Sequence, residues 1–142
     1  MNPEPIVKTL QLTCTPEKAF HSFTEEIGKW WPLATHSLAG NKHSICAFEP
    51  EVGGRLCETD NEGTEYEWGR VTAWDPPTRL AFTWRVGEAS NSEQHVEVTF
   101  SPTSSGTEVR LVHGGWTDST NWDGYQSGWD TVLSGFLDRV RV

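Results

Sequence analysis

The chain has 142 residues, which is close to the commonest length of a single domain. A domain of this length buries enough surface to fold without disulfides or structural metals. Its eleven lysines and arginines against twenty aspartates and glutamates give a net charge of −9. Because nucleic acids and anionic membranes bind basic surfaces, this charge argues against both as partners.

The sequence also lacks signals for export. Its first residues have neither the basic start nor the apolar core of a secretion signal. No apolar stretch reaches the ~20 residues that cross a bilayer. The three cysteines, Cys14, Cys46 and Cys57, are odd in number and have no C-x-x-C spacing. We therefore expect free thiols in a reducing, cytoplasmic compartment and no insertion into a membrane.

A strand and then a short helical region are predicted at the N-terminus. Residues 6–14 alternate as a strand does, and Thr15 and Pro16 have the side chains of a helix start. The helix has one apolar face, formed by Ala19, Phe20, Phe23 and Ile27. We expect Gly28 to break this helix and residues 35–41 to form a loop.

Two pairs of short strands follow. Residues 44–48 and 55–59 are separated by a turn that contains Gly53 and Gly54, which permit positive φ. Residues 66–74 and 80–86 are separated by two prolines, which cannot donate to a ladder and so must lie in the connection.

The register of the strand at residues 66–74 is ambiguous. Strict alternation places Trp68 and Trp74 on one face and Val71 on the other. Gly69 is a position where a bulge would reset the pleat. The sequence leaves both registers open.

The rest of the chain changes from strand to helix periodicity. Two strands carry inward residues at alternate positions: Val96, Val98 and Phe100 in the first, and Val109, Leu111 and His113 in the second. A long helix then has one broad apolar face, formed by Tyr125, Trp129, Val132, Leu133, Phe136, Leu137 and Val140. Hairpin-linked strands with helices at both ends predict an α+β domain whose antiparallel sheet is covered by the C-terminal helix.

The chain resembles the family of ATPase-activator homologues in five phrases that occur in order: WWPLATHS, FEPEVGGRLCE, EWGRVTAWDPPTRLAFTW, TEVRLVHGGW and GWDTVLSGFL. That family is related to the C-terminal domain of the heat-shock chaperone's ATPase activator. It belongs to the START-like superfamily, with the polyketide cyclases and the birch-pollen allergen. The resemblance implies one helix-grip domain over residues 1–142, with a curved antiparallel sheet of six or seven strands around the C-terminal helix. In several relatives, a cavity between sheet and helix takes apolar ligands.

The eight tryptophans suggest a binding site in that space. Each ring could fill the core, but rigid aromatic walls with few polar groups are also typical of apolar pockets. The predicted ligand-binding residues are Trp31, Trp68, Arg70, Phe82, Trp84, Leu111, His113, Trp116, Tyr125, Trp129 and Leu133. We expect Trp84 to form a pocket wall and Trp74 to be structural.

Two polar members of this set each allow two interpretations. His113 faces inward, either as a core histidine bonded to backbone or hydroxyl groups, or as a polar anchor or general acid–base. Arg70 lies either at the rim or inward, where it would need an acidic partner or an anionic ligand. The acidic residues are expected to be scattered on exposed faces without a catalytic pair.

Metal and nucleophile chemistry have little support. The best metal set is His43 with Cys46 and Cys57, which lacks the spacing of known sites. Residues 35–37, Thr-His-Ser, favour loop structure over a nucleophile and its base. We predict no metal, no cofactor and no catalytic residue.

Three functions remain. The first is binding of a small hydrophobic or aromatic ligand, lipid-like or polyketide-like, between the sheet and the C-terminal helix. The second is a protein-interaction module of the co-chaperone type with a chaperone or other protein partner, which predicts an exposed apolar patch. The third is a cyclase-type enzyme. Binding is favoured because an apolar lining is visible in the sequence and a nucleophile is not; the oligomeric state stays open.

Overall fold

The computed structural model describes residues 3–32, 44–85, 94–116 and 122–140. Its elements in chain order are β1 (Ile6–Leu12), α1 (Pro16–Thr24), α2 (Ile27–Trp30), β2 (Ile45–Phe48), β3 (Arg55–Thr59), β4 (Glu65–Asp75), β5 (Arg79–Thr83), β6 (His95–Thr103), β7 (Gly106–Gly114) and α3 (Trp122–Val140). The strands form one 7-stranded antiparallel sheet in the order β1-β7-β6-β5-β4-β3-β2. The predicted α+β helix-grip fold is confirmed, with a curled sheet and a long C-terminal helix.

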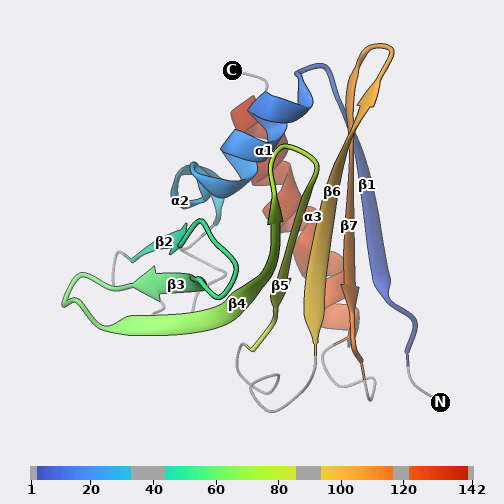
Figure 1. The fold of residues 1–142 in the computed structure, drawn as a ribbon. Helices are drawn as coiled ribbons and strands as arrows, with labels where there is room; N and C mark the ends of the chain where they lie inside the picture. Colours follow the sequence, from blue (N-terminus) through green and yellow to red (C-terminus); the bar gives the residue numbers. More distant parts are fainter. Residues whose placement is uncertain (1–2, 33–43, 86–93, 117–121, 141–142) are drawn as a thin grey trace.

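The sheet is curled into two halves, and β4 is part of both. In Figure 1, β5, β6, β7 and β1 stand side by side, while β2, β3 and the first half of β4 turn away from them. Two register shifts interrupt β4, one against β3 between Glu67 and Gly69 and one against β5 between Val71 and Ala73. Extra residues of this kind bend a strand and increase its twist.

These shifts answer the question of register in β4. Val71 pairs with Phe82 and Trp74 pairs with Leu80, so both face the same side of the sheet as their partners. Trp68 contacts Trp84, two residues beyond Phe82 in the chain. The inward positions Trp68, Val71 and Trp74 therefore follow one another at intervals of three residues. Regular alternation along a strand would require intervals of two.

Gly69 is required by this bend. A Cβ at this position would lie 1.8 Å from the carbonyl oxygen of Thr83. Of the two registers that the sequence left open, the structure shows the one with an irregularity beside Gly69, and the glycine lets the backbone of β4 pass close to the end of β5.

The N-terminal helical region differs from its prediction at one residue. Thr15 caps α1 as expected, accepting a hydrogen bond of 3.2 Å from the backbone N–H of Lys18. The predicted helix break at Gly28 is wrong, because Gly28 lies inside α2 and the interruption falls between Thr24 and Ile27. A Cβ on Gly28 would lie 2.9 Å from the carbonyl oxygen of Cys46, so the glycine permits close packing of α2 against β2.

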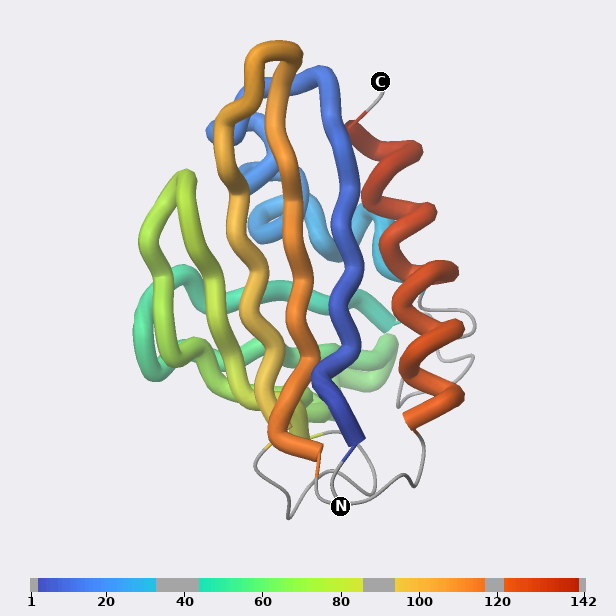
Figure 2. The backbone as a smooth tube through the Cα atoms, turned by 90° about the vertical axis from the view of Figure 1, so that its right-hand side faces the viewer, coloured from blue at the N-terminus to red at the C-terminus, as the bar shows by residue number. Residues whose placement is uncertain are grey.

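The helix α3 covers the concave side of the sheet, as predicted, and Figure 2 shows it running beside β1. Its buried face consists of Trp129, Val132, Leu133, Phe136 and Val140. Two ion pairs fix its position: Lys8 of β1 with Asp130 at 3.0 Å, and Glu26 with Arg139 at 2.7 Å. The Arg139 guanidinium and the Ser22 hydroxyl lower the pKa of Glu26 to about 2.

Candidate functional site

A continuous group of rings lies between α3 and the sheet. This aromatic cluster consists of Trp31, Trp68, Trp84, His113, Trp116, Tyr125 and Trp129. Centroids of neighbouring rings are 4.6 to 6.4 Å apart, in tilted or edge-to-face pairs. Tyr125 is half-buried and the other members are buried. The structure thus brings together seven of the eleven predicted site residues.

Segments far apart in the sequence contribute to this cluster. Trp31 follows α2, Trp68 belongs to β4, and His113 ends the inward row of β7. Tyr125 and Trp129 are one helical turn apart on α3. Trp84 lies at the centre, where its ring meets those of Trp31, Trp68, His113, Tyr125 and Trp129.

Four indole N–H groups of the cluster are bound by the protein itself. Trp68 donates to Glu58 Oε1 at 3.2 Å, and Trp84 donates to the Tyr125 hydroxyl at 3.1 Å. Trp116 and Trp129 both donate to His113, to its carbonyl oxygen at 2.8 Å and to its Nδ1 at 3.0 Å. These four indoles therefore offer carbon faces and edges, rather than N–H groups, to anything that packs against them.

The hydrogen bonds of His113 determine its tautomer. Because Nδ1 accepts from Trp129, the proton lies on Nε2, which donates to Gln94 Oε1 at 2.8 Å. Burial lowers the pKa of His113 to about 3, and the nearby His95 adds to the effect. The ring is neutral at physiological pH and both nitrogens are engaged. This arrangement is that of a core histidine, with side chains as partners in place of the expected backbone or hydroxyl groups, and it leaves neither nitrogen available as a general acid–base.

A buried acidic residue adjoins the cluster, and the sequence analysis missed it. Glu58 of β3 is fully buried, and its Oε2 accepts a hydrogen bond of 2.5 Å from Ser44 Oγ while Oε1 accepts from Trp68. Asp60 is also buried. The expectation that the acidic residues lie on exposed faces is therefore wrong for these two. Glu58 shares a strand face with the buried Leu56 two residues earlier, and that alternation was the available signal.

The other four predicted site residues lie outside the cluster. Phe82, Leu111 and Leu133 are buried in the surrounding core, and Phe82 also contacts Trp84 with a centroid distance of 6.4 Å. Arg70 is exposed, with 55% of its side chain accessible. The inward position considered for Arg70 is therefore wrong.

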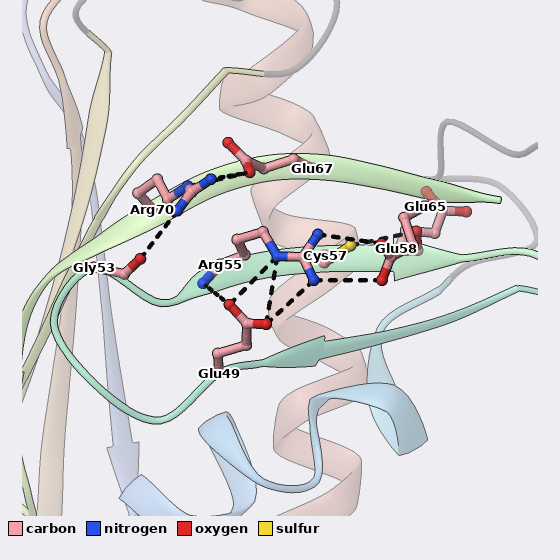
Figure 3. Close-up of polar contacts among 8 residues, drawn as sticks. All are labelled: Glu49, Gly53, Arg55, Cys57, Glu58, Glu65, Glu67 and Arg70. Carbon is pink, nitrogen blue, oxygen red and sulfur yellow. Dashed lines mark hydrogen bonds and ion pairs between the residues drawn. The ribbon is translucent and has the colours of Figure 1, made fainter. Parts of the chain in front are cut away.

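The outer face of β3 and β4 carries a network of exposed charges, shown in Figure 3. Arg70 Nη2 lies 2.9 Å from Glu67 Oε1, and Arg70 Nη1 donates to the Gly53 carbonyl oxygen at 3.2 Å. Arg55 pairs with both Glu49 and Glu65 at 3.2 and 3.3 Å. These pairs hold neighbouring segments of the outer face together and are separate from the aromatic cluster.

Other predicted chemistry falls partly outside the described residues. His43 and the Thr-His-Ser sequence at 35–37 lie there. Cys46 and Cys57 are buried free thiols, and burial together with the charge of Glu58 raises the pKa of Cys46 to about 12. Within residues 3–32, 44–85, 94–116 and 122–140, no three His, Cys, Asp or Glu side chains are grouped to hold a metal. No helix in these ranges has the length and apolarity needed to span a bilayer.

Comparison with known proteins places this architecture in a family. The model of the family "Activator of Hsp90 ATPase homolog 1-like protein" matches residues 13–140. No curated protein matches the chain. Two solved structures show the same fold at low identity. The Aha1 dimer from Colwellia psychrerythraea is 18% identical, with a TM-score of 0.73 and coverage of 97% of this chain and 96% of that one. The AHSA1-like protein from Aeromonas hydrophila is 22% identical, with a TM-score of 0.70 and coverage of 96% and 92%.

A third structure has higher sequence identity. It is the anthrahydroquino-gamma-pyrone synthase Txn09, solved in complex with SUM. It is 33% identical to this chain, with a TM-score of 0.61 and coverage of 96% of this chain and 97% of that one. Together with the family match over nearly the whole length, these similarities show that the chain belongs to the activator of Hsp90 ATPase homolog 1-like family.

Proposed function

We propose that this protein binds a small, planar aromatic compound of the polyketide type against the aromatic cluster, between the sheet and α3. The observation that carries the proposal is that four indole N–H groups of the cluster already donate hydrogen bonds within the protein. Trp68, Trp84, Trp116 and Trp129 each donate to an acceptor within the protein. A ligand in contact with these rings would meet their π-faces and edges, so it would be selected for flatness and aromaticity.

The geometry of the rings favours an aromatic ligand over a flexible lipid. Ring pairs in tilted or offset contact contribute about 0.5–1.5 kcal/mol beyond the area that they bury. A fused-ring ligand can make several such contacts at once without losing rotatable bonds, whereas an acyl chain loses conformational freedom on binding. The buried polar groups of this region are few, His113 within the cluster and Glu58 beside it, as is typical of small-molecule sites.

The similarity to Txn09 supports the same ligand class. Its name identifies the product as a fused-ring aromatic compound, and it is 33% identical to this chain over 96% of the chain. A related protein of this fold that is named as the synthase of a fused-ring compound makes such a compound a reasonable first ligand to test here.

Tryptophan fluorescence gives a direct test. The protein is titrated with 2-naphthol, with anthraquinone and, as a lipid, with dodecanol, and native mass spectrometry of the fresh preparation searches for a co-purified compound. We expect saturable quenching by the two aromatic probes with affinity at least tenfold above that for dodecanol, about 1.4 kcal/mol in binding free energy. Absence of saturable binding by both aromatic probes would contradict the proposal.

A matched pair of variants locates the site. Trp84→Leu removes the ring at the centre of the cluster. Trp74→Leu removes a ring that packs instead against Phe20 and Phe48, with centroid distances of 5.4 and 6.1 Å. We expect Trp84→Leu to weaken 2-naphthol binding about tenfold or more and Trp74→Leu to leave it within about twofold. Equal losses in the two variants would place the ligand elsewhere.

Cyclase-type catalysis is a second candidate, because the 33% identical relative is a synthase. It predicts that the protein converts a linear polyketone into a cyclised product. Chromatography of the reaction mixture measures this conversion. Conversion no faster than in buffer would leave binding as the function.

The co-chaperone interpretation has less support from the described surface. The exposed large hydrophobic residues within it are Val7, Ile45 and Val52. Val7 lies on β1 and Ile45 on β2, which are the two opposite edges of the sheet. Scattered single residues of this kind are normal on protein surfaces, whereas an interaction patch is contiguous.

A further inference from the structure

Gln126 of α3 has a buried oxygen that accepts no hydrogen bond. Within residues 3–32, 44–85, 94–116 and 122–140, its Oε1 is the one buried side-chain nitrogen or oxygen without a hydrogen-bond partner. Nearly all buried polar groups in folded proteins are paired, because an unpaired group has lost its hydrogen bonds to water without replacement. An apolar side chain of similar size would avoid this cost. Stability therefore does not explain a glutamine at this position.

Gln126 adjoins the aromatic cluster on the surface of α3. It directly follows Tyr125 and precedes Trp129 by three residues, and both of these rings belong to the cluster. Because residues three and four apart are neighbours on a helix, Gln126 lies beside Trp129 on one side and beside Asp130 on the other. Asp130 in turn forms an ion pair of 3.0 Å with Lys8 of β1. Gln126 is therefore at the border between the cluster and β1.

The indole donors next to this position are engaged elsewhere. Trp122, four residues earlier on α3, donates to the Glu4 carbonyl oxygen at 2.9 Å. Trp129 donates to His113 Nδ1 at 3.0 Å. The described part of the chain thus places aromatic surface beside Gln126 but brings no N–H or O–H group to its Oε1.

We infer that Gln126 Oε1 accepts a hydrogen bond from the bound ligand, so that the site selects planar aromatic compounds with a hydroxyl group at the edge of the ring system. This inference rests on the proposed function. The tryptophan rings select for flatness, because four of their N–H groups are already bound within the protein. A phenolic hydroxyl would pair with the buried oxygen, and a hydrogen bond away from water is stronger than an exposed one. An analogue without the hydroxyl is rejected because the acceptor then stays unpaired.

The test compares 2-naphthol with 2-methoxynaphthalene, which has the same fused rings but no hydroxyl donor. Binding is measured by tryptophan quenching in wild type and in Gln126→Met, which keeps the length of the side chain and removes its amide. We expect wild type to bind 2-naphthol about tenfold or more tightly than the methyl ether, and this ratio to fall about fivefold or more in Gln126→Met. The unliganded variant should unfold at the same urea concentration as wild type or at a higher one, because it no longer buries an unpaired oxygen.

The matched control is Gln11→Met, because Gln11 is exposed on β1 and its Nε2 donates to Glu108 Oε1 at 2.9 Å. This variant should keep the wild-type ratio of affinities. A wild type that does not prefer 2-naphthol, or a ratio unchanged in Gln126→Met, overturns the role of Gln126 and leaves the proposed function in place. Loss of folding or of stability in Gln126→Met overturns it as well, because the fold itself would then require the glutamine. Failure of both probes to bind wild type instead overturns the proposed function, and this inference with it.

Discussion

Two aromatic regions lie between α3 and the sheet, and they differ in their polar partners. The phenylalanine cluster consists of Phe20, Phe23, Trp30, Phe100 and Phe136, with neighbouring centroids 5.2 to 5.9 Å apart. Trp30, which has the one indole in this cluster, donates from Nε1 to the backbone carbonyl oxygen of Ser22 at 2.7 Å. The aromatic cluster begins at the next residue, Trp31, whose ring is 5.9 Å from that of Trp30.

Apart from the half-buried Tyr125, the members of both regions are buried, so burial alone does not distinguish a core from a binding site. The difference lies in buried side chains that can ionise: the aromatic cluster has His113 within it and Glu58 beside it. Burying such groups costs free energy that apolar filling would avoid. Because these ionisable side chains are found with the aromatic cluster, we assign binding to the aromatic cluster and stability to the phenylalanine cluster.

The largest expected effect on stability is in the phenylalanine cluster. Phe136→Ala should lower the free energy of unfolding by about 3–5 kcal/mol, because Phe136 is fully buried between Phe23 and Trp30. Urea denaturation measures this loss, and Phe136→Leu should recover most of it. The folded fraction should still bind 2-naphthol as wild type does. A loss below about 1 kcal/mol would show that α3 is held mainly elsewhere.

In the aromatic cluster, His113→Phe removes hydrogen bonds rather than apolar volume. It preserves much of the ring volume but leaves the Trp129 N–H and the Gln94 side chain without their present partner. We expect a loss of about 2–4 kcal/mol from these buried groups, measured by urea denaturation, together with weaker binding of the aromatic probe. Wild-type stability in this variant would mean that the hydrogen bonds of His113 contribute little.

The pH dependence of stability provides a separate test of the same residue. The pKa of His113 is about 3 in the folded protein and near 6.5 when unfolded, so the unfolded state binds the extra proton between these values. Stability should therefore fall as pH falls from 6.5, by up to about 1.4 kcal/mol per pH unit. The slope between pH 6.5 and 4.5 should be smaller in His113→Phe. Parallel curves for the two proteins would contradict this assignment.

Glu26 should contribute to the pH dependence of stability at lower pH than His113 does. Its pKa is about 2 when folded against 4.5 when unfolded, so its stabilisation is present above pH 4.5 and is lost as pH falls toward 2. Glu26→Gln should flatten that part of the acid-denaturation curve, with a modest effect at pH 7 because Arg139 is 35% exposed and screened by solvent. An unchanged curve below pH 4.5 would place the acid sensitivity in other carboxylates.

The smallest effect is expected outside both clusters. Arg70→Ala removes an exposed pair with Glu67 and should change the free energy of unfolding by less than about 1 kcal/mol. Affinity for 2-naphthol should stay within about twofold of wild type. A larger loss of affinity, measured by the same fluorescence titration, would bring Arg70 back into the binding site despite its outward position.

The sequence predicted the elements and the inward rows of the regular ones. Val109, Leu111 and His113 are all buried, as alternation along a one-faced strand requires. Trp129, Leu133 and Phe136 are likewise buried, because their spacing matches the helical repeat. These predictions succeeded because each depends only on the local period of the backbone.

Tertiary structure alone decided what surrounds those side chains. The bulges of β4 turned Arg70 outward and Val71 inward, and bulge positions depend on the neighbouring strands β3 and β5. The partners of His113 come from positions 16 and 19 residues away, and the partner of Trp68 comes from the adjacent strand. Local periodicity fixes the face on which a side chain lies. Hydrogen-bond partners, the tautomer of His113 and the burial of Glu58 depend on contacts between distant segments, which form only when the sheet curls around α3.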